Sequence, residues 1–379
     1  MDCRQRRSPK RPHLPITTWR SQIYTRSWER PLSAIASNYH LWMLFLPIDQ
    51  RDCSENFMPI ILEPTDLSIQ RAAEAMRAGR AVAFPTETVY GLGALTLDPR
   101  GIAEVYRMKW RPTNNPLIAH VLDARGAKQV VEGWDPRCDE LTSRLWPGPL
   151  TLVLPRRSSV PVEACGGRST VAVRSPSHPV ARRLLQELGG ESISAPSANR
   201  SGHVSPTLAS HVAEDFATEP DLMILNGGRS EFGLESTVLD LTTPRPTLLR
   251  PGTVTLESLR QILGDVDAPE LTEQGASPGT APRHYAPRTP AALVQINGIR
   301  AALALEPRPC AVLCFDPSHV PSPHTGITMP RDARLYGSTL YDALRSADTL
   351  GCARILIEMP PSSDGLWRAV VDRLRRATT

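Results

Sequence analysis

The chain has 379 residues, of which 41% are hydrophobic, and a formal net charge of +4. This length suffices for two or more domains of about 100–200 residues, and the composition excludes a largely disordered or membrane-embedded chain. The mild basic excess is compatible with a nucleic-acid or nucleotide partner without requiring one. Seven scattered cysteines without CxxC spacing predict no metal site and indicate reduced thiols in a cytoplasmic protein.

The first 57 residues differ in composition from the rest. Residues 1–28 carry seven Lys or Arg and one acidic residue, with Ser and Thr between them. The apolar stretch Leu41–Ile48 is too short to span a bilayer, so we expect no membrane association. We predict a disordered tail or an extension that begins too far upstream. A targeting segment is the alternative.

From Met58 onward the pattern is that of a folded domain. Ile69, Ala72, Ala73 and Met76 recur with helical spacing, and Gly79 ends the predicted helix. Further helices are predicted at 99–109, 179–188, 206–216 and 255–263. Short apolar runs predict strands at 81–85, 117–123, 150–155, 170–176, 193–195, 222–228, 236–241 and 247–252. Their irregular alternation favours an α/β domain with a twisted, mixed sheet.

A change in composition divides the chain after this domain. Residues 266–289 are rich in Pro, Gly, Ser and Thr and lack any period, so they are predicted to be a linker. It separates a catalytic domain, 58–265, from a C-terminal α/β domain, 290–379. Strands predicted at 291–296, 309–315 and 353–359, with helices at 338–351 and 366–378, indicate a small parallel sheet there.

Three polar segments, 85–93, 109–117 and 195–202, adjoin the predicted strands of the first domain. They offer hydroxyl groups and fixed cations but few carboxylates, a combination suited to a polyanion such as a nucleoside triphosphate. The charged and polar residues that could bind such a ligand also have simpler, structural interpretations. Lys109 and Arg111 fit an exposed helix end, His120 a satisfied core histidine, and Arg250 a turn. An RNA-binding module is the alternative function, although only 5% of the residues are aromatic.

Eight motifs then occur in a fixed order: PTETVYGLGA, KWRPTNNPLIAHV, LWPGPLTLVL, TVAVRSPSHPVA, SAPSANRSGHVSPT, GLESTVLDL, LLRPGTVT and SPGTAPRHYAP. In this order they resemble YrdC-type proteins, and the last motif with the C-terminal unit resembles the long, two-domain form. The resemblance covers residues 60–379. It implies a YrdC-like twisted mixed sheet with flanking helices, plus a smaller Rossmann-like C-terminal α/β domain.

The resemblance also implies an activity, that of a nucleotidyltransferase called L-threonylcarbamoyladenylate synthase. Such enzymes form threonylcarbamoyl-AMP and pyrophosphate from L-threonine, bicarbonate or CO2, and ATP, with Mg²⁺ accompanying the ATP. Downstream transferases place the threonylcarbamoyl group on tRNA, beside the anticodon, and weak RNA binding is a further expectation. A related carbamoyl-nucleotide enzyme acting on another acceptor is the alternative within this chemistry.

Site residues follow from the matching motif positions. The resemblance assigns catalysis to Lys109 and Arg111, and L-threonine binding to Thr86, His120, Arg174, Ala195 and Ser236. It assigns ATP binding to Lys109, Arg111, Asn115, Thr170, Ser197, Asn199, Ser205 and Arg250. His284 and Tyr285 would belong to a linker that closes over the site as a lid, with a passive tether as the alternative.

Overall fold

The computed structural model describes residues 58–268, 284–295 and 298–378. The predicted tail, 1–57, and residues 269–283 of the predicted linker lie outside the described residues. All described residues belong to one compact unit, Glu55–Thr379. No helix in the described part of the chain combines the length and the apolar character that a membrane crossing requires.

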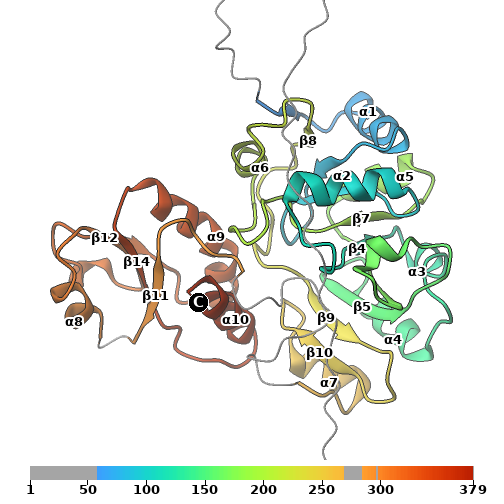
Figure 1. The fold of residues 1–379 in the computed structure, drawn as a ribbon. Helices are drawn as coiled ribbons and strands as arrows, with labels where there is room; N and C mark the ends of the chain where they lie inside the picture. The colour runs from blue at the N-terminus through green and yellow to red at the C-terminus, as the bar shows by residue number, and fades with distance from the viewer. Residues whose placement is uncertain (1–57, 269–283, 296–297, 379) are drawn as a thin grey trace, which may run out of the picture. The chain divides into compact units, whose positions relative to one another are not determined.

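The larger part of the structure is built on a ten-stranded mixed sheet (Figure 1). Its strands, in spatial order, are β1 (Ile60–Leu62), β8 (Met223–Leu225), β2 (Val82–Phe84), β3 (Gly91–Leu95), β7 (Ile193–Ala195), β4 (Ile118–His120), β6 (Thr170–Arg174), β5 (Leu150–Pro155), β9 (Thr237–Asp240) and β10 (Thr247–Arg250). Parallel and antiparallel neighbours alternate irregularly along it, for example β4 with β6 and with β7. The predicted mixed sheet is confirmed.

Helices cover both faces of this sheet. One core contains α1 (Asp66–Arg77) and α5 (Pro179–Glu187). The other contains α2 (Pro99–Lys109), α4 (Pro136–Leu145), α6 (Ala209–Asp215) and α7 (Leu256–Leu263). Two short segments, α3 (Ala124–Ala127) and η1 (Val162–Cys165), complete this part. Val82 and Phe84 face the first core and Ala83 the second, as the two-residue period of a strand requires.

The smaller part is a four-stranded parallel sheet, ordered β11 (Ala291–Val294), β14 (Arg354–Glu358), β12 (Cys310–Cys314) and β13 (Thr325–Thr328). One face packs on α8 (Ile299–Ala304), and the other packs on α9 (Ala333–Thr349) and α10 (Trp367–Ala377). A one-turn helix, η3 (Pro317–His319), follows β12. The predicted small parallel sheet is thus confirmed, with β13 as a strand that the sequence pattern did not predict.

The points at which α2 begins and ends determine where Arg111 lies. Asp98 caps its first turn by accepting a hydrogen bond from the Arg100 N–H, and Pro99 occupies the first helical position. The helix stops after Lys109 because Trp110 adopts a left-handed conformation, with φ of 51°. The chain therefore turns sharply there and carries Arg111 away from the helix axis into the neighbouring loop.

Candidate active site

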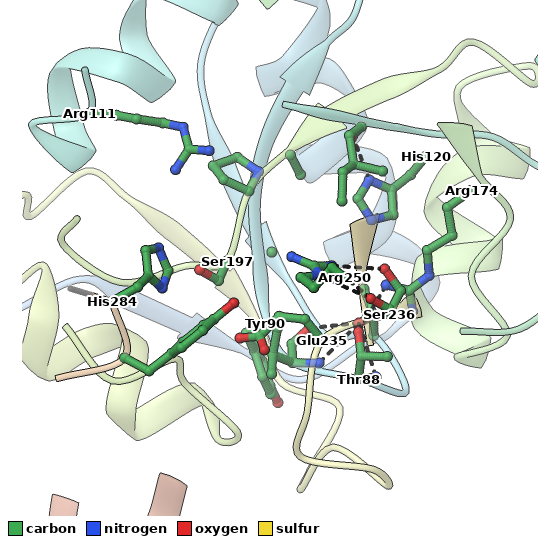
Figure 2. A pocket seen from close by; sticks show the side chains of 17 residues that line it. Thr88, Tyr90, Arg111, His120, Arg174, Ser197, Glu235, Ser236, Arg250 and His284 are labelled. Carbon is green, nitrogen blue, oxygen red and sulfur yellow. Dashed lines mark hydrogen bonds between the residues drawn. The ribbon is translucent and has the colours of Figure 1, made fainter. Parts of the chain in front are cut away.

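A pocket lies beside the central strands of the larger sheet and gathers residues from eight separate segments. Its walls include Thr86, Thr88, Tyr90, Arg111, His120, Arg174, Ala195, Ser197, Glu235, Ser236, Arg250, His284 and Tyr285. Figure 2 shows Arg111, Ser197 and His284 on one side of it and His120, Arg174 and Ser236 on the other. Ten of the predicted site residues thus line one pocket.

Arg174, at the end of β6, forms the centre of one wall. Its Nη2 lies 2.6 Å from Oε1 of Glu87, and its Nη1 donates to the Thr88 hydroxyl at 2.9 Å. Burial alone would raise the pKa of Glu87, but the charge of Arg174 outweighs it and the pKa is lowered. The Arg174 Nε makes no hydrogen bond to any described residue. It is therefore a buried donor available to an anionic group in the pocket.

His120 lies in the same wall and is buried as a core histidine would be, while it also lines the pocket. It is buried on β4, and its Nδ1 lies 3.0 Å from the carbonyl oxygen of Ile118. Burial and the charge of Arg174 lower its pKa to about 4, so the ring is neutral at physiological pH. A neutral imidazole can orient a ligand through a hydrogen bond but carries no charge to bind it.

Arg111 forms part of the opposite wall and organises its own loop. Its Nη2 donates to Oδ1 of Asn115 at 2.6 Å and to the carbonyl oxygen of Pro116 at 2.8 Å. Burial lowers the pKa of Arg111 to about 10, which still leaves it charged at neutral pH. Among the described residues it forms no ion pair with a carboxylate, unlike Arg174. Its charge is thus not neutralised by the protein.

Lys109 differs from the exposed helix-end residue that was one interpretation of the sequence. It is 1% exposed, and its Nζ donates to the carbonyl oxygens of Ser197, at 2.5 Å, and of Asn199. Burial and the neighbouring charge of Arg111 hold its pKa well below the usual value. Lys109 itself does not line the pocket in this structure, but it fixes the loop that presents Ser197 there.

Ser236 directly precedes β9, and Arg250 is the last residue of β10, at one end of the sheet. Arg250 donates from Nε to the carbonyl oxygen of Ser236 at 3.1 Å and from Nη2 to its hydroxyl oxygen at 3.1 Å. The Ser236 hydroxyl also bonds to that of Thr151 at 2.7 Å. Arg250 is only 3% exposed, so the interpretation as a simple turn residue is wrong.

Glu235 is a pocket residue that sequence reasoning missed. Its Oε1 accepts from the Ser205 hydroxyl at 2.6 Å, and its Oε2 accepts from the Tyr341 hydroxyl and from Arg373 Nε, both at 2.9 Å. Burial would raise its pKa, but the charges of Arg373 and Arg250 outweigh burial and lower it to about 2. Tyr341 lies on α9 and Arg373 on α10. The smaller part of the molecule therefore holds a wall residue of the pocket.

The linker residues His284 and Tyr285 lie against the same wall. Tyr285 stacks on Tyr341 with ring centroids 5.6 Å apart, and its backbone has φ of 60°, a strained value for a residue with a side chain. His284 donates its N–H to the carbonyl oxygen of Arg376 at 3.2 Å, and its Nδ1 is buried without a hydrogen bond to the described residues. The cavity that remains is about 40 Å³.

Five predicted residues do not line this pocket: Lys109, Asn115, Thr170, Asn199 and Ser205. Four of these five residues form hydrogen bonds with residues that line the pocket. Those of Lys109, Asn115 and Ser205 are described above. Asn199 accepts from the Ser197 hydroxyl at 2.5 Å. Thr170 begins β6, four residues before Arg174, and is half-buried. The carboxylates in and beside the pocket are few: Glu235 is the one that lines it in the described part of the chain, and Glu87 lies behind Arg174, with which it pairs.

A mixed sheet that brings Arg111, Arg174 and Arg250 together with several hydroxyls defines an α/β protein with a pocket suited to small anionic ligands. Comparisons with known proteins identify the family to which this α/β protein belongs. Residues 74–252 match the Sua5/yciO/yrdC family, described as telomere recombination, and residues 254–379 match the family described as threonylcarbamoyl-AMP synthase, C-terminal domain.

Two similar proteins carry the name threonylcarbamoyl-AMP synthase, which denotes a nucleotidyltransferase. One, from Pyrococcus abyssi, is 39% identical over 82% of this chain and 94% of its own length. The other, from Bacillus subtilis, is 37% identical over 83% and 94%. A crystal structure of Pyrococcus abyssi Sua5 complexed with L-threonine matches 84% of this chain and 97% of its own, with 36% identity and a TM-score of 0.78. The chain belongs to this Sua5/YrdC family, in the form with the additional C-terminal domain.

Proposed function

We propose that this protein forms threonylcarbamoyl-AMP and pyrophosphate from L-threonine, bicarbonate or CO2, and ATP. One observation carries the proposal: Arg111, Arg174 and Arg250, distant in sequence, line a single pocket with neutral polar groups between them. The reaction needs one cation for an amino-acid carboxylate and others for a triphosphate. The similar crystal structure of Pyrococcus abyssi Sua5 complexed with L-threonine supports L-threonine as the amino-acid substrate.

The two walls suit the two substrates. The free Nε of Arg174, with the hydroxyls of Thr86 and Ser236 nearby, would bind the carboxylate and the side chain of threonine. Arg111, Arg250 and Ser197 would hold the triphosphate, with Lys109, Asn115, Asn199 and Ser205 supporting them. Thr170 would also serve the ATP side, and Ala195 would contact threonine.

The chemistry then depends on position and charge. The threonine amine and CO2 form a carbamate, whose oxygen attacks the α-phosphorus of ATP and displaces pyrophosphate. Carbamates lose CO2 readily in water, so holding the reactants together and excluding solvent promote the reaction. Arg111 would stabilise the negative charge that develops on the phosphates, because it is already in place and is not neutralised by a carboxylate. The carbamate is itself the nucleophile, so the neutral His120 need not act as a base.

Mg²⁺ would enter with ATP rather than in a site of the protein's own. Among the described residues, no three His, Cys, Asp or Glu side chains lie close enough to hold a metal ion. Mg²⁺ commonly binds through substrate phosphates, waters and one or two protein oxygens, and the hydroxyl-rich wall fits that arrangement. Its contribution would be to neutralise phosphate charge.

The linker residues would act as a lid. A cavity of about 40 Å³ is far smaller than the roughly 300–1,000 Å³ typical of small-molecule sites, so His284 and Tyr285 must move to admit ATP. The strained backbone of Tyr285 is consistent with a segment that adopts more than one position. We expect replacement of both by alanine to reduce product yield more than ATP binding. Unchanged yield would indicate a passive tether.

A direct experiment tests the activity. The protein is incubated with ATP, Mg²⁺, bicarbonate and one amino acid at a time, and pyrophosphate release is measured, with mass spectrometry of the adenylate. We expect release only with L-threonine. Release with a different acceptor would indicate a related carbamoyl-nucleotide enzyme, and RNA binding without any release would favour the RNA-binding module. The product would supply downstream transferases that modify tRNA beside the anticodon.

A further inference from the structure

The smaller sheet has a crevice of its own, at the carboxyl ends of its strands. After β12, Phe315 packs on the face covered by α9 and α10, and the segment then crosses to the face covered by α8, where Val320 packs. The segment after β14 packs on the opposite face, through Leu366 and Trp367. β12 and β14 are adjacent and parallel. Where neighbouring parallel strands lead to opposite faces, a crevice forms at their carboxyl ends, and ligands of open α/β sheets bind there.

A cavity of about 410 Å³ occupies this position, and its size falls within the range of small-molecule sites. Cys314 and Glu358, the last residues of β12 and β14, form its buried base. Charged and polar side chains line the remainder: Arg300, Asp316, His319 and Arg331. None of these residues lines the pocket of the proposed active site.

The crevice carries charges of both signs: Asp316, whose Oδ2 lies 3.5 Å from His319 Nε2, lines it together with Arg300, Arg331 and Glu358. Glu358 is only 5% exposed, and one of its carboxylate oxygens accepts the Phe315 N–H at 2.7 Å. Arg331 lies over the Phe315 ring at 5.4 Å, which places its guanidinium beside the same loop. Within the described residues, neither Arg331 nor Arg300 forms an ion pair, although Arg354 of the same sheet pairs with Glu306. The crevice therefore offers two cations and a buried acceptor to one ligand.

We propose that this crevice binds a nucleotide. Arg300 and Arg331 would hold the phosphates, since guanidinium groups match phosphate oxygens in charge and geometry. Glu358 would accept hydrogen bonds from the ribose hydroxyls, as an acidic residue at a strand end does in doubly wound folds. A free amino acid also carries both charges, but a cavity of about 410 Å³ is large for one. The site is separate from the proposed catalytic pocket.

Equilibrium dialysis of the full chain with radiolabelled ADP, without threonine or bicarbonate, tests the site by counting bound nucleotides. We expect two ADP per chain in the unmodified protein and one in the Arg300→Ala/Arg331→Ala variant, or affinity at that site at least about tenfold weaker. Arg308→Ala, an exposed arginine of the same sheet outside the crevice, is the matched control and should bind two. Pyrophosphate release by the double variant should stay near normal, which shows that it folds.

Further arms separate the ligand classes and the two sites. Glu358→Gln should weaken ADP but not tripolyphosphate, because only ADP has ribose hydroxyls. Arg111→Ala should remove the ADP bound in the proposed active site. Loss of both bound ADP molecules should therefore require Arg111→Ala together with Arg300→Ala/Arg331→Ala. Equal ADP binding by the unmodified protein and the Arg300→Ala/Arg331→Ala variant would overturn the crevice site without touching the proposed activity. Displacement of this ADP by millimolar L-threonine would overturn the nucleotide assignment.

Discussion

The pocket contains two buried carboxylate–arginine pairs, and they differ in what holds them. Glu87 and Arg174 both belong to the larger part of the molecule, and Arg174 lines the pocket itself. Glu235 lines the pocket, but its arginine, Arg373, is fully buried behind it on α10. In one pair the cation lines the pocket, and in the other the anion does.

Under the proposed function, this difference separates a binding role from a positioning role. Arg174 has a buried donor, Nε, without a hydrogen bond to the described residues, whereas Arg373 donates to Glu235 and Asp372. Through Glu235 and its hydrogen bond from Ser205, the C-terminal helices stabilise the wall that carries Ser236. The C-terminal part is thus structurally coupled to the pocket, although it contributes no ligand-facing arginine among the described residues.

The largest expected effect is on stability, from Arg373→Ala. The change leaves Glu235 buried without its ion-pair partner, while Asp372 keeps the pair with Arg376, so we expect the free energy of unfolding to fall by about 3–5 kcal/mol. Urea denaturation measures it. Arg354→Ala, which breaks the half-exposed pair with Glu306 in the same part, is the control and should cost about 1 kcal/mol or less. Equal losses in the two variants would contradict the positioning role.

The next effect is on activity, from Arg111→Ala. Arg111 lines the pocket and forms no ion pair with a carboxylate of the described residues, so removing it should lower kcat/KM for ATP by about a hundredfold, or roughly 3 kcal/mol. Pyrophosphate release measures it, with a circular dichroism spectrum to verify the fold. Arg107→Ala removes an exposed arginine from α2 and should leave turnover near normal. Near-normal turnover in the Arg111 variant would show that the phosphates bind elsewhere.

Local patterns predicted the sheet class, whereas the resemblance of the motifs singled out Arg174 and Arg250 of the pocket. β3 was missed because Gly91 and Gly93 give it a weak strand signal. The structure explains Gly93: a Cβ there would lie 2.6 Å from Cγ2 of Ile193 and 2.9 Å from Cβ of Ala195. The glycine permits close contact with β7, so the feature that hid the strand is required by the sheet. α4 was also missed, although Asp135 and Pro136 are typical start signals.

The role of Glu235 could not be predicted in the same way. Its partners, Tyr341 and Arg373, are 106 and 138 residues away along the chain. No periodicity or spacing links positions that far apart, and an acidic residue in a polar motif is usually exposed. What the motif GLESTV did indicate, through the resemblance, was the neighbouring Ser236.

Tyr341→Phe and Thr88→Val test the difference between the two carboxylate–arginine pairs, since each removes a hydroxyl that forms a hydrogen bond with one of them. Tyr341→Phe removes a hydrogen bond to the buried Glu235, but Arg373 Nε stays on the same oxygen, so we expect a loss of about 2 kcal/mol in stability. The KM for threonine should stay nearly constant. Thr88→Val frees Arg174 Nη1 and should instead raise that KM several-fold. If Tyr341→Phe instead raised the KM for threonine and Thr88→Val lowered only the stability, the roles assigned to the two pairs would be reversed.

The smallest effect is a pH dependence that the two walls share. Burial lowers the pKa of His120 to about 4 and that of His284 to about 3, from 6.5. The groups that face His120 are Arg174 and Glu87, and those that face His284 are Glu235, Arg111, Lys109 and Arg250. Because both folded pKa values lie below 6.5, the unfolded chain binds more protons below that pH, and stability falls as pH falls.

From about pH 7 to about pH 5.5, each histidine should therefore reduce the free energy of unfolding by about 1 kcal/mol. His120→Gln and His284→Gln, each compared with the unmodified protein by urea denaturation across this range, should flatten the dependence by that amount whatever their effect at neutral pH. A variant with an unchanged slope would show that its histidine is accessible to protons in the folded state. For His284 that result would mean that the linker leaves the pocket open in solution, and the buried arrangement of Tyr285 against Tyr341 would then be a minor state.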